Sequence, residues 1–141
     1  MKVFLDSSVW FAAAFSPGGG SGEVVRRSAA RKATIVATKQ VIAETVRNLQ
    51  AKGNPVALER FFEFYAQARP TVVEPNPTQT KEAVAVINPK DAPILAGAKI
   101  SNCQFLVTLD RRHFFTDEVA QFAQPTEIIL PGELLKSISF L

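Results

Sequence analysis

The sequence predicts an α/β fold in which helices cover both faces of a central parallel sheet, a three-layer α/β/α sandwich of about five strands. Short, uniformly apolar runs alternate with segments whose apolar residues recur at helical spacing. Strands that are apolar throughout are typical of parallel sheets buried on both faces. The 141 residues, 47% of them hydrophobic, suit a single domain over residues 1–141.

The N-terminal segment predicts a strand, a helix and a loop. Residues 2–5 (KVFL) form an apolar run. Ser7 and Ser8 are candidate caps for a helix that continues to Phe15. The glycine-rich stretch 16–22 ends that helix. It predicts a flexible loop, because it lacks the Lys-Ser/Thr ending of a phosphate loop and follows a helix instead of a strand.

An amphipathic helix with one basic side follows this loop. Its basic side chains are Arg26, Arg27, Arg31 and Lys32. Residues 34–37 predict the second strand, and the helix after it ends near Gly53. Asn54 and Pro55 predict the start of a further helix, which ends before Pro70.

The C-terminal half predicts three more strands. They are residues 71–73, 105–109 and 127–130. A short helix ends before Pro89, and the next helix has Asp91 at its N-terminus. A final helix is indicated by Leu134, Leu135 and Ile138.

The composition excludes several classes of protein. A single cysteine, Cys103, excludes an intramolecular disulfide framework and indicates a reducing, cytoplasmic location. The apolar run 9–15 is too short to cross a membrane, and Asp6 interrupts any secretory signal. The net charge of +3 is too small to indicate a nucleic-acid partner by itself.

Four carboxylates converge in the predicted topology. Asp6 and Asp110 each follow an apolar strand, so both lie at the carboxyl edge of the parallel sheet. Asp91 begins the helix that leads into the fourth strand, and this helix starts at the same edge. Glu44 lies in the second turn of the helix after the second strand, close to that edge. We therefore expect these four acids to form one site.

Clustered carboxylates repel one another unless a cation lies between them, so the four acids predict a divalent metal site. Ligand sets made only of oxygen atoms favour Mg²⁺ or Mn²⁺ over zinc. Such an ion activates water and neutralises a phosphate group, which suits the hydrolysis of phosphodiesters. The residues alone leave open that each acid only caps a helix or a turn.

Four segments resemble the PIN domain, a family of small metal-dependent ribonucleases. They are, in order, VFLDSSV at 3–9, Glu44, KDAPILA at 90–96 and LVTLDRRHF at 106–114. The resemblance spans nearly the whole chain, and the last two segments are the most specific. It implies that Asp6, Asp91 and Asp110 bind Mg²⁺ or Mn²⁺ directly. Glu44 would be a further ligand or would orient the attacking water.

The same resemblance implies supporting residues and partners. Ser8 and Thr108 would supply hydroxyl groups that hold a carboxylate or a metal-bound water, and Asp117 would be an occasional outer ligand. Small members are similar to VapC-type toxins, which cleave RNA and are neutralised by an antitoxin. The resemblance therefore implies an RNA substrate, a cognate antitoxin and a homodimer.

Several basic and aromatic residues have both a functional and a structural interpretation. Arg26, Arg27, Arg111 and Arg112 are candidates for contacts with RNA phosphates, or they form solvated faces. His113 fits a structural hydrogen bond better than a general base. The remaining candidates are aromatic. Trp10, Phe11 and Phe15 pack in the core, unless one of them stacks on a base or meets a partner helix. Part of the cluster Phe61, Phe62, Phe64 and Tyr65 is a candidate dimer or antitoxin surface.

Two other classes of function stay open. A catalytically silent PIN scaffold would bind RNA or protein without turnover. A metal-dependent phosphatase of the haloacid dehalogenase type also has an Asp after its first strand. That group needs a second Asp two residues further on, where this chain has Ser8.

Overall fold

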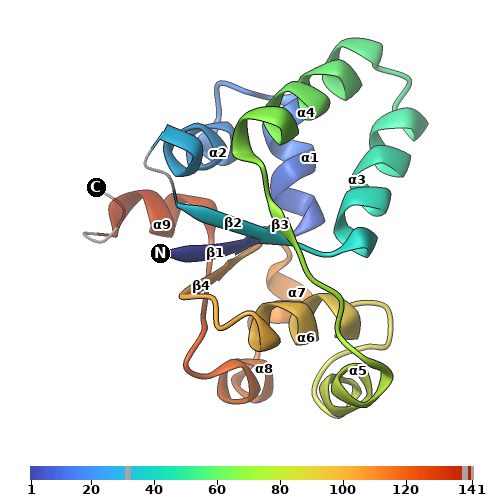
Figure 1. Ribbon diagram of the computed structural model, residues 1–141, viewed down its shortest axis with the longest axis vertical. Coiled ribbons are helices and arrows are strands. Elements are labelled where there is room, and N and C mark those ends of the chain that lie inside the picture. Colours follow the sequence, from blue (N-terminus) through green and yellow to red (C-terminus); the bar gives the residue numbers. More distant parts are fainter. Residues whose placement is uncertain (31–32, 138–139, 141) are drawn as a thin grey trace.

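Five short parallel strands form the central sheet, in the order β3-β2-β1-β4-β5 (Figure 1). The computed structural model describes residues 1–30, 33–137 and 140. β1 (Lys2–Leu5) lies in the centre, and its neighbours are β2 (Thr34–Ala37) and β4 (Phe105–Val107). The edge strands are β3 (Thr71–Val72) and β5 (Glu127–Ile129).

Helices cover both faces of this sheet, which confirms the predicted three-layer fold. One face carries α1 (Ser7–Phe15), α2 (Gly20–Ala30), α3 (Lys39–Ala51) and α4 (Pro55–Ala68), with α9 (Pro131–Lys136) packed against α2. The other face carries α5 (Pro77–Val84), α6 (Ala92–Ile100) and α8 (Asp117–Ala123). The short helix α7 (Arg111–Phe114) begins directly after Asp110, near the carboxyl edge of the sheet. No helix in the described part of the chain combines the length and the apolar character needed to span a membrane.

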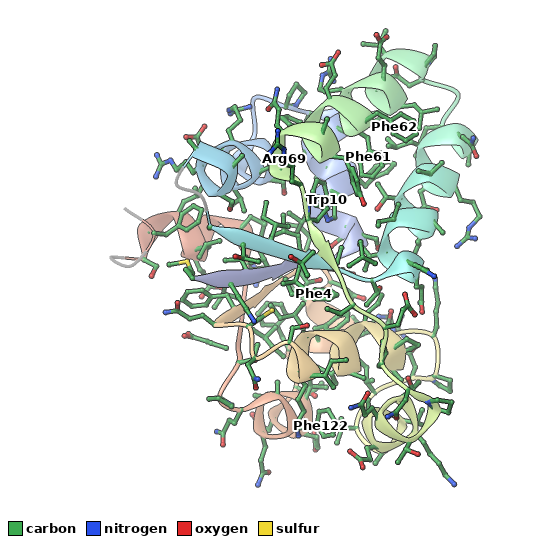
Figure 2. The ribbon with its side chains drawn as sticks, in the orientation of Figure 1. Phe4, Trp10, Phe61, Phe62, Arg69 and Phe122 are labelled. Atoms are coloured by element: carbon green, nitrogen blue, oxygen red, sulfur yellow. The ribbon has the colours of Figure 1, made fainter. Side chains whose placement is uncertain are left out.

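The core lies on both sides of β1, whose Phe4 is fully buried between the layers (Figure 2). On the α1 face, Trp10 packs edge-on against Phe61 of α4, with ring centroids 5.7 Å apart and an interplanar angle of 83°. Buried aromatic pairs of this kind anchor neighbouring helices. Phe64 is also buried, whereas Phe62 is 52% exposed and points away from the core.

Helix starts follow local capping rules. The hydroxyl of Thr38 accepts a hydrogen bond from the backbone N–H of Val41 at 3.2 Å and so caps α3. The predicted start of α4 is confirmed, because the side chain of Asn54 accepts from the N–H of Ala57 at 3.1 Å. Each of these helices therefore begins where its sequence satisfies the first free N–H groups.

Several predicted bounds were wrong. Asp6, rather than Ser7 or Ser8, is the N-cap residue of α1. The glycine-rich stretch is a loop only to residue 19, because α2 begins at Gly20. A Cβ atom on Gly22 would lie 2.2 Å from the carbonyl oxygen of Pro17, so a residue without a side chain is needed for this packing.

The C-terminal half shows further differences. The predicted strand 105–109 ends at Val107, and α7 and α8 were not predicted at all. The helix predicted before Pro89 begins at Pro77, where Asn76 and Gln79 form a capping box. Arg31, Lys32 and Ile138 lie outside the described residues.

Candidate functional site

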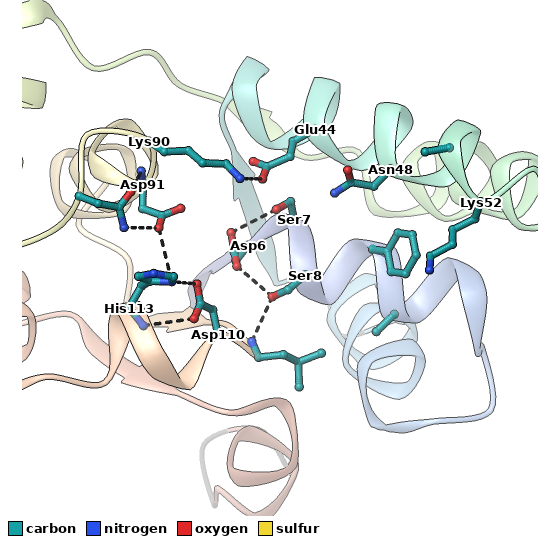
Figure 3. A pocket seen from close by; sticks show the side chains of 15 residues that line it. Asp6, Ser7, Ser8, Glu44, Asn48, Lys52, Lys90, Asp91, Asp110 and His113 are labelled. Carbon is teal, nitrogen blue, oxygen red and sulfur yellow. Dashed lines mark hydrogen bonds and ion pairs between the residues drawn. The ribbon is translucent and has the colours of Figure 1, made fainter.

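A cavity of about 660 Å³ opens at the carboxyl edge of the sheet, between α1, α3, the start of α6 and α7 (Figure 3). All four acids that the sequence singled out line this cavity: Asp6, Glu44, Asp91 and Asp110. Asp6 and Asp110 follow the neighbouring strands β1 and β4, while Asp91 is the N-cap residue of α6. Glu44 comes from the second turn of α3. The parallel topology thus brings together carboxylates that are far apart in the sequence.

Two hydroxyl groups hold the carboxylate of Asp6. Thr108 Oγ1 and Ser8 Oγ both donate to Asp6 Oδ2, at 2.8 and 2.9 Å. The same oxygen atoms accept backbone hydrogen bonds, Thr108 Oγ1 from the N–H of Asp110 and Ser8 Oγ from the N–H of Leu109, both at 3.0 Å. These hydroxyls therefore tie the Asp6 carboxylate to the turn that carries Asp110.

The Asp6 carboxyl is deeply buried, with 4% of the residue exposed. Burial raises the pKa of this carboxyl above its ordinary value. The hydrogen bonds from Thr108 and Ser8 act in the opposite direction, and the negative charge of Asp91 adds to the rise in pKa. The ionised form of Asp6 therefore lacks enough compensating positive charge in the protein itself.

Asp91 and Asp110 are each fixed by a neighbour three residues away. The amide of Asn88 donates to Asp91 Oδ2 at 2.7 Å, and its carbonyl oxygen accepts from the N–H of Asp91 at 3.0 Å. Asp110 Oδ1 accepts from the backbone N–H of His113 at 3.1 Å, and Oδ2 lies 2.8 Å from His113 Nδ1. The predicted structural hydrogen bond of His113 is therefore present, with a site carboxylate as its partner.

Glu44 faces the same cavity from α3. Burial raises its pKa, while the Lys90 ammonium, 3.8 Å from Oε1, lowers it. The charges of Asp6 and Asp91 add to the rise. The other carboxylate oxygen, Oε2, is buried and has no hydrogen-bond partner among the described residues. A buried acceptor without a protein donor is uncommon, and such oxygen atoms are completed by a water molecule or a cation.

The donor set fits a divalent cation. One ligand atom each from Asp91, Asp110 and His113 lie within 4.8 Å of one another in the described part of the chain. Asp6 and Glu44 line the same cavity, and Glu44 Oε2 has a free acceptor position. Carboxylate oxygens suit Mg²⁺ or Mn²⁺, and one imidazole nitrogen is compatible with Mn²⁺. The tightest group thus includes His113, which the sequence did not propose as a ligand.

The other predicted site residues lie in different places. Ser8 lines the cavity and Thr108 is buried beneath it. Asp117, the expected outer ligand, does not line this cavity: it begins α8 and lines a separate cavity of about 440 Å³. α7 ends at Phe114, and α8 begins at Asp117, away from the acidic cavity. The spacing between Asp110 and Asp117 in the sequence did not reveal this path of the chain.

None of the four candidate arginines lines the cavity. Arg111 and Arg112 are exposed on α7. Arg26 and Arg27 are each paired with Glu23 at 2.8 Å, and Arg26 also donates to the carbonyl oxygen of Pro17 at 2.7 Å. Both arginines are thus engaged in contacts within the protein, and their contact with RNA phosphates stays a prediction.

Sequence reasoning missed several residues that line the cavity, namely Asn48, Lys52, Asn88 and Lys90. Asn88 was detectable, because an Asn three residues before an Asp at a helix start is a capping pattern. Asn48 and Lys52 had no such signal. Their position depends on the packing of α1 against α3.

The fold and the site together define a small α/β domain with an acidic centre at the carboxyl edge of its sheet. The PIN domain matches residues 3–119, which include all four acids. The chain therefore belongs to the PIN-domain family, whose members are generally nucleases. This membership sets aside the haloacid dehalogenase alternative.

Two solved structures share this fold. One is a chain from VapBC2 of Rickettsia felis bound to a DNA fragment from their promoter, with 16% identity, a TM-score of 0.68, and coverage of 92% of this chain and 98% of that chain. The other is PAE2754 from Pyrobaculum aerophilum, with 18% identity, a TM-score of 0.63 and 96% of each chain covered. No curated protein matches the sequence.

Proposed function

We propose that this protein is a divalent-metal-dependent ribonuclease that cuts RNA phosphodiesters internally. The observation that carries this proposal is the convergence of Asp6, Glu44, Asp91 and Asp110 on one open cavity in a PIN-domain fold. Asp6, Asp91 and Asp110 would hold Mg²⁺ or Mn²⁺, and Glu44 would complete the site. When bound, the cation supplies Lewis-acid activation of water and neutralises charge on the scissile phosphate.

The protein's own residues prepare this site in three ways. Ser8 and Thr108 donate hydrogen bonds to Asp6 Oδ2, while Ser7 Oγ contacts Oδ1 at 3.5 Å. Asn88 fixes the orientation of Asp91, and His113 fixes that of Asp110. Side chains that are already held in position lose little conformational freedom when they bind a metal ion.

Lysine side chains at the cavity wall add positive charge for a polyanionic substrate. Lys90 and Lys52 both line the cavity, and Lys90 is highly exposed, with 75% of its side chain accessible. Ammonium groups at such positions attract phosphates over a distance set by salt concentration. RNA binding should therefore weaken as the salt concentration rises.

We further propose that the protein is the toxin of a type II toxin–antitoxin pair, cytoplasmic and homodimeric. The structural likeness to a chain of VapBC2, a complex bound to promoter DNA, supports a cognate antitoxin as partner. We expect a reading frame for a small antitoxin beside the gene. We also expect expression of the protein to arrest growth, and Asp6→Asn to abolish this arrest. Unaffected growth on expression of the intact chain would contradict the toxin assignment.

The direct test is cleavage of a labelled circular RNA by the purified protein in Mg²⁺ or Mn²⁺. Only an endonuclease can cut a circle, so linear product establishes the internal mode of cleavage. We expect activity to be lost in EDTA and in Asp6→Asn. Asp117→Asn is the matched control, because this acid lies outside the cavity, and it should retain activity. RNA binding without cleavage would favour the silent PIN scaffold.

A further inference from the structure

The cavity extends beyond its acidic end along the packed helices α1 and α3. The residues of this extension are Phe11, Ala12, Asn48, Ala51 and Lys52. In Figure 3, Asn48 and Lys52 lie along α3, on the side of Asp6 away from Asp91. None of these residues has a role in the metal site proposed above. We refer to this part of the cavity as the Phe11 arm.

Helical spacing makes the Phe11 arm continuous with the acidic end. On α3, Glu44, Asn48 and Lys52 are four residues apart in turn, so they lie on one face of the helix. On α1, Ser8 precedes Phe11 by three residues and shares its face. Asn48 is therefore ~6 Å and Lys52 ~12 Å from Glu44 along the helix axis. A strand whose phosphate lies at the acids would extend into this arm.

The ring of Phe11 is held in place before any ligand binds. It is half-buried and stacks on Phe15, with centroids 5.5 Å apart and planes inclined by only 11°. A fixed aromatic ring at a cavity wall provides a stacking surface that loses little side-chain freedom on binding. Aromatic side chains of this kind stack on unpaired nucleobases.

Two polar groups accompany this ring. The amide of Asn48 offers two donors and an acceptor, and it is exposed on α3. The ammonium of Lys52 is exposed too, and no salt bridge binds it within the described residues. An aromatic ring, an amide and a cation match the flat surface, the polar edge and the phosphate of one nucleotide unit.

We propose that the Phe11 arm is a subsite for one unpaired nucleobase beside the scissile phosphate of single-stranded RNA. The base stacks on Phe11, Asn48 contacts its polar edge, and Lys52 contacts the next phosphate. Phe11 and Asn48 are then specificity-determining residues for the reaction. The subsite rests on the proposed ribonuclease function, because the acidic end defines where the phosphate lies.

The test measures RNA binding without catalysis. Fluorescein-labelled single-stranded octaribonucleotides are titrated with metal-free protein in EDTA, and fluorescence anisotropy gives the Kd. Each oligonucleotide is used intact and with one abasic nucleotide at successive positions. The variants are Phe11→Leu, Phe11→Tyr, Asn48→Ala and Lys52→Ala. Phe62→Leu and Lys81→Ala are matched controls, because these exposed residues lie outside the cavity.

We expect one abasic position to weaken binding to the wild type about tenfold, which corresponds to ~1.4 kcal/mol. Phe11→Leu should weaken binding of the intact oligonucleotide by a similar factor and should no longer distinguish it from the abasic one. Phe11→Tyr keeps the ring and should bind within about twofold of the wild type. Melting temperatures of all variants show that loss of binding is not loss of folding.

Several outcomes would overturn the subsite. Equal losses from the abasic position in wild type and Phe11→Leu mean that the base does not contact Phe11. Unchanged RNA binding by Phe11→Leu overturns the proposal. If RNA is cleaved in Mg²⁺ or Mn²⁺ but the abasic effect does not depend on Phe11, only the subsite is overturned. If the abasic effect depends on Phe11 but no RNA is cleaved, the nuclease is overturned and a base-binding site remains.

Discussion

The buried hydroxyl group of Thr108 connects the carboxylate of Asp6 to the backbone of Asp110. Its Oγ1 donates to Asp6 Oδ2 at 2.8 Å and accepts from the backbone N–H of Asp110 at 3.0 Å. The side chain is fully buried. Thr108→Val keeps the shape of this side chain and removes both hydrogen bonds, so it isolates the contribution of the hydroxyl.

The expected loss follows from these two bonds. A hydrogen bond to a charged group contributes ~1.5–3 kcal/mol, and an unsatisfied N–H in a partly buried turn adds ~1 kcal/mol. Thr108→Val should therefore lower the free energy of unfolding by ~2.5–4 kcal/mol at neutral pH. Thr108→Ser is the matched control, because it keeps the hydroxyl and loses one buried methyl group, at a cost of ~1 kcal/mol.

Urea unfolding monitored by circular dichroism measures this difference, provided that the urea dependence of both transitions is equal. Calorimetric titration with Mn²⁺ gives a second readout, in which Thr108→Val should weaken binding by ~10–100-fold, the range for residues that orient metal ligands. A Thr108→Val protein within ~0.5 kcal/mol of the wild type would refute the reasoning. Equal losses in the Ser and Val variants would refute it too, since they would assign the effect to packing.

Three further predictions follow from the same structure. Asp6→Asn should raise the melting temperature of the metal-free protein, because it removes a buried charge, and should lower RNA cleavage at least ~100-fold; a lower melting temperature would contradict this. The folded-state pKa of Asp6 lies above its ordinary value of 3.8, so its contribution to stability is fully present below pH 3.8 and is lost as pH rises through the folded-state pKa. Urea unfolding in EDTA from pH 4 to 8 should show this decline in the wild type. The decline should be smaller in Asp6→Asn. Gly22→Ala should cost ~2–3 kcal/mol in urea unfolding, because its Cβ would overlap the carbonyl of Pro17, while Gly18→Ala in open space should change stability little.

The regular elements were predictable where the chain carries a local signal. β1 and β2 have the predicted bounds, because each is an isolated four-residue apolar run. α4 begins where Asn54 and Pro55 predict it. α7 and α8 were missed, because they are too short to show apolar periodicity. Each instead has one side-chain cap: Asp110 Oδ1 accepts from the N–H of His113, and Thr116 Oγ1 accepts from the N–H of Val119.

Part of the site was predictable for the same reason. An acid directly after a buried strand must lie at the sheet edge, so Asp6 and Asp110 could be placed together from the topology alone. Asp117 shows the limit of this reasoning. It follows Asp110 by seven residues, yet the path of the chain through α7 takes it to another cavity.

The α/β class, the order of the five strands along the chain and the four acids at one sheet edge could all be predicted from the sequence. These properties depend on apolar runs and helical spacing, which are local. The surroundings of each acid, in contrast, depend on contacts between residues far apart in the sequence. Asp6 and Thr108 are 102 residues apart, so their hydrogen bond and the burial that raises the pKa of Asp6 exist only after folding. The Phe11 arm likewise exists only because α1 packs against α3, and no residue pattern along either helix encodes that packing distance.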